Sequence, residues 1–349
     1  MKKEIKVKLN GFSGQYENPS DYLKKYFPIK VFNDNFNVKF VNNLDEAEII
    51  FESTVRSSDY KFLNEKKKKV IIISGEDLFK ERDVFNLIES VVHKLGFKEE
   101  KWKIMDKIDS VLPKFVSSIP IIYFFPKFLK YVKKISRGEI KNAYALVQND
   151  MNGENIFILP CFFHTLYYDL PKLIKNNNKK IQDRKKFCAF IVSSNSSRER
   201  VHFFKKLSKY KRVDSYGKVQ NNMGNQLFKS NWNTNNEVYK NYKFVIGFEN
   251  NFAKEYISEK AQVPMLSGAI PIYRGAPNIH EYFNTKSFIN YDDYGSDDKV
   301  IKKIIELDQD DEKYLKMANE PWFVDNKIPK IFKEKEMELI KFYKKILES

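Results

Sequence analysis

Short apolar runs rich in β-branched residues recur along the chain, and polar stretches with helical spacing lie between most of them. In the first half these runs begin at Ile5 (IKVKL), Asn37 (NVKFV), Glu48 (EIIFES) and Lys69 (KVIIISGED). The second half contains FCAFIVSS, KFVIGFEN, IPIY and KSFINYDD. Apolar strands separated by helices or loops indicate largely parallel sheets, so the sequence predicts an α/β protein.

A polar stretch rich in lysine and asparagine, from Lys172 to Lys186, separates the two sets of runs and predicts a domain boundary. We expect an N-terminal domain over residues 1–170, a linker over 171–186 and a C-terminal domain over 187–327. The length of 349 residues suffices for two domains with a core each. Polar residues follow strands in both halves. This predicts a cleft between two open sheets, because ligands bind at the carboxyl ends of parallel strands.

The last segment, residues 328–349, has apolar residues at helical spacing with lysines and glutamates between them. It predicts a C-terminal amphipathic helix. Packing of this helix on the protein is favoured over binding to a membrane surface, because glutamates share its polar face with lysines. Peripheral contact with the inner membrane face, through this helix or the basic surface, is the alternative.

Composition indicates a folded chain, since 42% of residues are hydrophobic and 15% aromatic. The start, MKKEIKVKLNGF, lacks the uninterrupted apolar core of a signal peptide. The most apolar run, IPIIYFFPKFL, is too short for a membrane span and is broken by two prolines. Cys161 and Cys188 are the only cysteines and give no disulfide framework. These features predict a cytoplasmic protein.

The formal net charge of +16 makes anions plausible partners: nucleic acid, acidic lipid or a phosphorylated small molecule. A polyanion-binding module without enzymatic activity is therefore one alternative. Steep salt dependence of binding to any polyanion would favour that alternative.

The stretch YISEKAQVPMLSGAIPIYRG carries the strongest local signal. Tyr256, Glu259 and Lys260 lie at i, i+3 and i+4, which places them on one side if the helix extends back to Tyr256. Ser258 is a good N-cap residue, so Glu259 and Lys260 fall in the first turn. Free backbone N–H groups and the helix dipole favour a diphosphate there. A surface ion pair at a helix start is the alternative. Pro264 is expected to bend this helix and to leave the Lys260 carbonyl without its helical partner.

Other polar residues follow neighbouring strands in the same half. Phe248-Glu249-Asn250 ends the run FVIGFEN, and Arg198 and Arg200 follow FCAFIVSS across a loop rich in serine and asparagine. We expect these residues and the helix start to converge on one ligand.

These residues carry a resemblance to a known family. The segment YKFVIGFENNFAKEYISEKAQVPMLSGAIPIYRGAPNIHEYFNTKSFINYDD resembles the donor-binding core of the α-1,3-fucosyltransferases, glycosyltransferase family ten. The shared features are a strand ending in Phe-Glu-Asn, a Tyr-x-(Thr/Ser)-Glu-Lys element, and Ile-Pro-Ile-Tyr before a turn that contains glycine. With KKFCAFIVSSNSSRERVHFFKK the resemblance covers roughly Lys185 to Asp293.

The resemblance implies a GT-B enzyme with two Rossmann-like domains that face a central cleft. Such an enzyme is a hexosyltransferase-type glycosyltransferase of glycan biosynthesis, and it transfers fucose from GDP-β-L-fucose with inversion. Arg200 and Lys260 would neutralise the diphosphate. Asn250, Tyr256 and Glu259 would bind the fucose and ribose hydroxyls or stabilise positive charge on the sugar. No metal ion or other cofactor is expected, since fixed cations meet the developing negative charge.

On the acceptor side, the resemblance implies a glycan and no nucleic acid. The expected acceptor group is the 3-OH of N-acetylglucosamine or glucose in a lactosamine-type oligosaccharide. Glu76, in IIISGED, resembles the family's general base and would take the proton of that hydroxyl. Two residues depart from the family pattern: Asp77 stands where Asn is common, and Arg274 where Trp is common. The identity of the acceptor is therefore open. Within the enzyme class, the alternative is a relative that uses another GDP-deoxysugar, since binding of the diphosphate does not distinguish the sugar.

A metal-dependent transferase would need an Asp-x-Asp pair, and Asp308-Gln309-Asp310 supplies these letters. The run IIELDQDDEKYLKM around it is acidic and helix-like, so a solvated helix face or turn is favoured. The four histidines follow no metal-ligand spacing.

Overall fold

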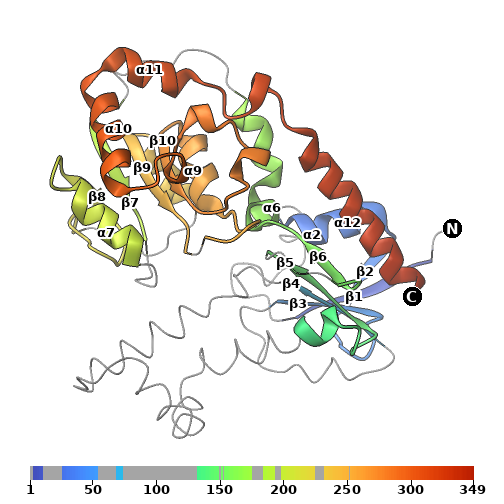
Figure 1. Ribbon diagram of the computed structural model, residues 1–349. Coiled ribbons are helices and arrows are strands. Elements are labelled where there is room, and N and C mark those ends of the chain that lie inside the picture. Colours follow the sequence, from blue (N-terminus) through green and yellow to red (C-terminus); the bar gives the residue numbers. More distant parts are fainter. Residues whose placement is uncertain are drawn as a thin grey trace, which may run out of the picture. The chain divides into compact units, whose positions relative to one another are not determined.

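The computed structural model is an α/β protein with two separate parallel sheets (Figure 1). It describes residues 3–10, 26–53, 68–73, 132–148, 151, 153–174, 184–192, 198–224, 232–250 and 252–349. The prediction of an α/β fold is thereby confirmed.

The first sheet has six parallel strands in the order β2-β1-β3-β4-β5-β6. Their bounds are Ile5–Asn10 (β1), Val38–Phe40 (β2), Ile49–Ser53 (β3), Lys69–Ile73 (β4), Ala143–Val147 (β5) and Ile156–Ile158 (β6). The four predicted apolar runs of the first half form β1 to β4. Every residue of β5 is buried, as expected for a strand covered on both faces of a parallel sheet. The sequence analysis did not single out β5 or β6.

The second sheet has five parallel strands in the order β11-β10-β9-β7-β8. Their bounds are Lys186–Phe190 (β7), Val213–Ser215 (β8), Tyr242–Phe248 (β9), Ile270–Arg274 (β10) and Ile289–Asn290 (β11). The four apolar runs of the second half form β7, β9, β10 and β11. The short strand β8 was not predicted.

Helices connect and cover these strands. The α-helices with assigned bounds are Phe27–Asn35 (α2), Cys161–Leu166 (α6), Arg198–Leu207 (α7), Trp232–Tyr239 (α8), Glu259–Ser267 (α9), Asp297–Gln309 (α10), Asp311–Asn319 (α11) and Lys330–Glu348 (α12). Short 3-10 helices are Tyr167–Leu173 (η3), Ile279–Glu281 (η5), Thr285–Ser287 (η6), Tyr291–Asp293 (η7) and Val324–Asn326 (η8).

The two faces of the second sheet pack against different helices. One face places Phe248, Ile270 and Ile272 in a core with residues of α7, α10 and α11. The other face packs Val245 against Val263 of α9 and Tyr239 of α8. Residues that alternate along β9 and β10 therefore point toward different helices, and this separates the polar groups at the carboxyl ends of these strands.

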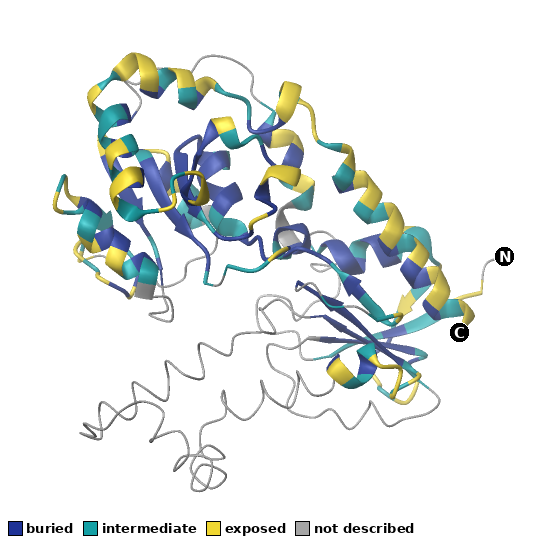
Figure 2. Cartoon of the chain, viewed as in Figure 1, coloured by how far each residue is buried: buried dark blue, intermediate teal, exposed yellow. Residues whose placement is uncertain are grey.

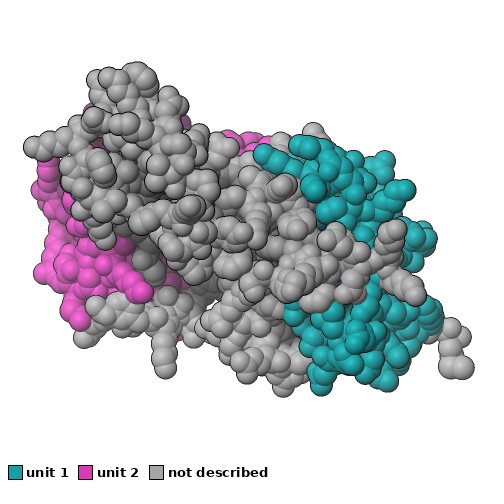
Figure 3. All heavy atoms as spheres, turned by 90° about the horizontal axis from the view of Figure 1, so that it is seen from below, with its two compact units in different colours: residues 1–22, 33–158, 344–349 teal, residues 23–32, 159–343 magenta. Residues whose placement is uncertain are grey.

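The chain divides into two compact units, coloured separately in Figure 3. Unit 1 comprises residues 1–22, 33–158 and 344–349, and unit 2 comprises residues 23–32 and 159–343. The boundary between the two units therefore lies between residues 158 and 159. The polar stretch that predicted a domain boundary begins later, at Lys172. Each unit also contains a short segment from the other half of the sequence: residues 23–32 belong to unit 2, and residues 344–349 belong to unit 1.

The predicted C-terminal amphipathic helix is α12, and its apolar side is packed on the protein. Phe332, Leu339, Tyr343 and Ile346 are each at most 1% exposed, whereas residues on the other side are exposed (Figure 2). The helix contributes to both units, because unit 2 ends at Tyr343 and residues 344–349 belong to unit 1.

Strand order decides where a ligand can bind on each sheet. In the second sheet β7 lies between β8 and β9, so the chain leaves β7 toward one side and returns on the other. Such a switch point opens a crevice at the carboxyl ends of the two central strands. In the first sheet the corresponding point lies between β1 and β3.

Candidate functional site

The start of helix α9 lies against the carboxyl end of β9 and forms a buried polar cluster with it. Ser258 is the N-cap, and its hydroxyl accepts the Lys260 backbone N–H. The same residue donates its N–H to Glu249 Oε1 at 2.7 Å and its hydroxyl to Oε2 at 2.5 Å. Lys260 Nζ lies 3.5 Å from Glu249 Oε2 and 3.1 Å from Glu259 Oε1. The predicted N-cap and the first-turn position of Glu259 and Lys260 agree with this geometry.

Burial and charge oppose each other in this cluster. Burial raises the pKa of the Glu249 carboxyl above its ordinary value, although the Lys260 charge opposes this. Burial alone would lower the pKa of Lys260, but the carboxylates of Glu259 and Glu249 outweigh it and raise that pKa. For Glu259, burial would raise the pKa, but Lys260 and the helix N–H groups hold it below its ordinary value. Lys260 is therefore a fixed cation at a helix N-terminus.

Arg200 and Asn250 meet across the switch point. Arg200 is in the first turn of α7, which follows β7, and Asn250 follows β9. The Arg200 Nη1 donates to Asn250 Oδ1 at 2.5 Å, and the arginine is only 1% exposed. The convergence of the two strand-to-loop junctions, expected from the sequence, is present. The side chain of Arg198 lies outside the part of the chain described here.

Tyr256 does not share a helix face with Lys260. Helix α9 begins at Glu259, and Tyr256 lies in the preceding loop with its backbone N–H on the Ala253 carbonyl. The sequence placed the three residues on one side only if the helix extends back to Tyr256. It does not, because Ser258 is extended and is the N-cap from which α9 begins. Tyr256 is buried, at 3% exposure, in the loop that leads to the cluster.

This loop is held in place by long-range contacts. Glu255 has a φ of 67°, a left-handed conformation that non-glycine residues rarely adopt. Its carboxylate accepts hydrogen bonds from Tyr282 at 2.7 Å and Asn278 at 3.1 Å, and its N–H donates to Asn278. The Ile257 carbonyl accepts the N–H of Phe162 in α6. These contacts fix the backbone that presents Ser258.

Pro264 lies inside α9, as the sequence indicated, and leaves the Lys260 carbonyl without an N–H four residues later. That carbonyl lies over Gly247 of β9, where an added Cβ would come within 2.5 Å of the oxygen. The missing side chain of Gly247 allows α9 to approach the strand this closely.

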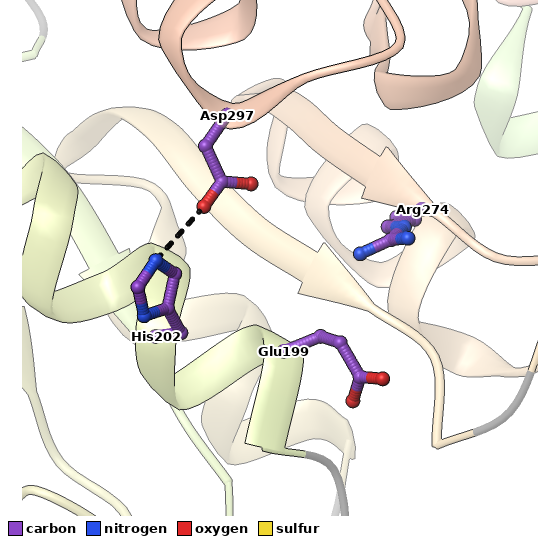
Figure 4. A pocket seen from close by; sticks show the side chains of 4 residues that line it. All are labelled: Glu199, His202, Arg274 and Asp297. Atoms are coloured by element: carbon purple, nitrogen blue, oxygen red, sulfur yellow. Dashed lines mark ion pairs between the residues drawn. The ribbon is translucent and has the colours of Figure 1, made fainter.

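Arg274, at the end of β10, lies on the other face of the sheet. Its guanidinium carbon lies over two aromatic rings, 4.4 Å from the centroid of Phe252 and 4.2 Å from that of Tyr291. It lines a pocket of about 300 Å³ with Glu199, His202 and Asp297 (Figure 4). The His202 imidazole lies 3.5 Å from Asp297, which also accepts the Tyr291 hydroxyl at 2.8 Å.

The predicted base, Glu76, and its neighbour Asp77 lie outside the described residues. Within those residues, the carboxyl end of the first sheet carries a polar pair at the switch point between β1 and β3. The side-chain amide of Asn10 donates to Glu52 Oε2 at 2.7 Å, and Glu52 is 2% exposed.

Glu249 and Glu52 were not predicted as site residues, although Glu249 was noted as part of the strand end Phe248-Glu249-Asn250. Each ends or follows an apolar strand, next to residues that were considered. The available signal was a carboxylate at the carboxyl end of a predicted parallel strand. Its significance depends on strand order, which local sequence does not give.

The two aspartates of the Asp-x-Asp sequence, Asp308 and Asp310, do not lie together in one site. Asp308 accepts hydrogen bonds from Tyr210 and Lys211 and lies 3.4 Å from Lys243. Asp310 instead caps α11 through the Lys313 N–H. In the described ranges no group of three or more His, Cys, Asp and Glu side chains could hold a metal ion. None of the helices described there is long and apolar enough to cross a membrane.

The second half of the chain is similar in sequence to known proteins. Residues 181–344 match glycosyltransferase family 10 (fucosyltransferase), C-terminal region. An alpha-(1,3)-fucosyltransferase of Helicobacter pylori is 34% identical over 134 residues, which are 38% of this chain and 27% of that protein. The 4-galactosyl-N-acetylglucosaminide 3-alpha-L-fucosyltransferase 9 of Homo sapiens is 30% identical over 145 residues, 40% of this chain and 38% of that protein. The alignments therefore span less than two fifths of these relatives' length.

Solved structures extend the likeness to the whole fold. A crystal structure of an alpha1,3-fucosyltransferase matches with a TM-score of 0.66 and 19% identity, covering 100% of this chain and 91% of that one. A structure of an alpha1,3-fucosyltransferase with GDP-fucose matches with a TM-score of 0.62 and 18% identity, covering 99% and 90%. At this identity the match establishes the fold, a GT-B type with two parallel-sheet units.

Proposed function

We propose that the chain is an inverting fucosyltransferase, because residues 181–344 match the C-terminal region of glycosyltransferase family 10 (fucosyltransferase). Its donor is GDP-β-L-fucose. Its acceptor is a hydroxyl of a glycan, with the 3-OH of N-acetylglucosamine or glucose in a lactosamine-type oligosaccharide as the expected group. The proposal includes no metal ion or cofactor and no nucleic-acid partner.

The observation that carries the proposal is the buried cluster of Glu249, Ser258 and Lys260 at the start of α9. Lys260 is a positive charge at a helix N-terminus, held by two carboxylates. Arg200, buried on α7, adds a second cation at the same switch point. Two fixed cations and the positive end of the helix dipole suit the diphosphate of a nucleotide sugar.

In the proposed reaction, an acceptor oxygen attacks the anomeric carbon of the donor while the bond from that carbon to the β-phosphate oxygen breaks. The electron pair of the broken bond stays on GDP as it leaves. Lys260 and Arg200 stabilise this charge before it has fully formed, because they are already oriented. Asn250, Tyr256 and Glu259 would contact the fucose and ribose or stabilise positive charge on the sugar ring.

Glu76 is proposed as the general base that takes the proton of the attacking hydroxyl. Support comes from the sequence resemblance at Gly75-Glu76. Strand β4, whose last residue is Ile73, leads directly to this segment. Glu52 is the carboxylate with which Glu76 is compared in the test below. It lies on β3, the strand next to β4, and pairs in register with Ile72.

Direct assay tests the proposal. The purified chain is incubated with GDP-fucose and an array of lactosamine-type glycans, and product linkage is read by mass spectrometry and NMR. We expect Glu76→Gln to lower turnover at least a hundredfold, in the range for loss of a general base, while GDP affinity stays near the wild-type value. Wild-type turnover in Glu76→Gln, with loss in Glu52→Gln, would move the base to Glu52.

The alternative donor is a different GDP-deoxysugar, because residues that bind the diphosphate do not distinguish one sugar from another. A panel of GDP-sugars separates the two cases by relative kcat/KM. If no GDP-sugar binds and polyanions bind with steep salt dependence, the non-enzymatic alternative replaces the proposal.

Cytoplasmic location, with peripheral contact at the inner membrane face as the alternative, is proposed from the sequence alone. Burial of the apolar side of α12 supports a protein-packing role for that helix. Fractionation of cells with antibody detection tests the location.

A further inference from the structure

Arg274 departs from the family pattern, and its surroundings are unusual for a surface arginine. Its guanidinium lies over two aromatic rings, those of Phe252 and Tyr291. Within the described part of the chain, the guanidinium N–H groups make no hydrogen bond and no ion pair to protein. Two cation–π contacts restrain the guanidinium, and its N–H groups remain able to donate hydrogen bonds.

The pocket at this edge offers donors and acceptors together. Glu199 and Arg274 lie on one side of it, while His202 and Asp297 face each other on the other side (Figure 4). A phosphate or carboxylate ligand would meet two carboxylates, and an ammonium ligand would meet Arg274. Hydroxyl groups fit this mixture, since each can accept from an N–H and donate to a carboxylate. The volume of about 300 Å³ is at the low end for ligand pockets and suits a single small ring.

The pocket adjoins the proposed donor site. Glu199 directly precedes Arg200 in α7, and the Arg274 carbonyl accepts the N–H of Glu249 at 2.8 Å. Arg274 nevertheless points toward α7 and α10, because it alternates with Tyr273 along β10, whereas Glu249 points toward α9. Its pocket is therefore distinct from the Lys260 cluster.

We propose that Glu199, His202, Arg274 and Asp297 form a sugar-binding subsite that takes the vicinal hydroxyls of one pyranose ring, with the Arg274 guanidinium donating to them. This inference rests on the proposed function, which supplies the sugar substrates. Two sources have the same chemistry: the sugar that the donor carries, and a unit of the acceptor glycan.

The test compares wild type with Arg274→Gln, Arg274→Lys and, as a matched control, Arg212→Gln. Arg212 is a largely exposed arginine of unit 2 that pairs with Asp214 away from the pocket. Calorimetry gives Kd for GDP and for GDP-fucose, and kinetics give KM for the acceptor. If the ring is the donor's, both Arg274 variants bind GDP-fucose about tenfold more weakly and GDP equally well, as expected for loss of one charge-assisted hydrogen bond. If it is the acceptor's, donor affinities stay unchanged and acceptor KM rises by a similar factor.

Arg274→Lys keeps the positive charge but loses the planar fork, so it guards against a variant that merely fails to fold. Wild-type values in Arg274→Lys with a wild-type Tm would overturn the proposal. Equal losses for GDP and GDP-fucose would also overturn it, because Arg274 would then contact the nucleotide or diphosphate.

Failure of the proposed function is seen separately, as absence of GDP binding by the wild type. In that case saturation-transfer NMR with L-fucose and with N-acetyllactosamine tests the pocket directly. A signal present in the wild type and Arg212→Gln but absent in Arg274→Gln supports the subsite. The same signal in all three, or in none, contradicts it.

Discussion

At the scale of single residues, Glu249 is the carboxylate on which the α9 start depends. It binds both the N–H and the hydroxyl of Ser258 and lies beside Lys260. Sequence reasoning chose Lys260 and Glu259 from a local motif. Glu249 was noted only as part of a strand end and was given no role, because its partners lie nine residues or more away along the chain.

Glu249→Gln tests this role. The amide keeps the size of the side chain but removes the charge, and one of its two groups cannot accept from Ser258. We expect GDP affinity to fall about tenfold, the effect of losing one hydrogen bond to a charged group, because Lys260 loses one of its two carboxylate partners. Calorimetry measures it. Glu237→Gln, at an exposed glutamate on α8, is the control, and wild-type affinity in Glu249→Gln would contradict the assignment.

His164 gives a prediction for stability against pH. It is 4% exposed, and burial lowers its pKa from 6.5 to about 4, with the Tyr26 hydroxyl 3.2 Å from Nδ1. Below pH 6.5 the unfolded chain binds a proton at this histidine that the folded chain binds only near pH 4. The free energy of unfolding therefore falls as pH falls through this window, by at most about 3 kcal/mol from His164.

Urea unfolding at pH 7 and pH 4.5 measures this change. We expect His164→Phe to show a smaller loss of stability between the two pH values than wild type, whereas His280→Phe, at an exposed histidine, should match wild type. Equal losses in all three proteins would show that His164 does not titrate as described.

At the scale of elements, α9 works as a short helix fixed at both ends. Ser258 caps its start, and Gly268 ends it with a φ of 76° while its N–H donates to the Met265 carbonyl. The capping residue and the effect of Pro264 were predictable from sequence, because both act within a few residues. The close approach of the Lys260 carbonyl to Gly247 was not, because it joins a helix to a strand.

Gly247→Ala tests that approach. The added methyl would lie 2.5 Å from the Lys260 carbonyl oxygen, so α9 must shift and both Tm and GDP affinity should fall. Gly224→Ala is the comparison, since its Cβ meets nothing within 4 Å and its cost comes only from a φ of 69°. We expect that cost to be about 1 kcal/mol. Thermal melts and calorimetry on both variants measure the difference, and a smaller loss in Gly247→Ala would be contrary to this packing.

At the scale of the whole molecule, α12 is one element that serves both units. Its last turn belongs to unit 1, where Lys69 Nζ donates to the Ile346 carbonyl at 2.5 Å and Tyr144 binds Ser349. A lysine at the end of a helix satisfies carbonyls that lack helical partners. The chain end therefore stabilises a unit that begins far away in the sequence.

Ile346→Ala should lower the free energy of unfolding by about 2–4 kcal/mol, as for other buried large-to-small changes. Met337→Ala is the control on the same helix, since Met337 is 47% exposed and should cost under about 0.5 kcal/mol. Chemical denaturation measures both. Equal effects would mean that the apolar side of α12 contributes little to stability.

The sequence alone determined what depends on neighbours along the chain. The strands from IKVKL to IPIY, the amphipathic end and the Ser258 cap follow from local spacing, which sets how a short segment buries its apolar side. Only the tertiary structure decided the strand order β11-β10-β9-β7-β8 and the contacts that this order creates. Glu249, the Arg200–Asn250 pair and the stacked Arg274 became site features because residues from different strands meet at one sheet edge. No local pattern encodes that meeting, because it depends on which strands pair.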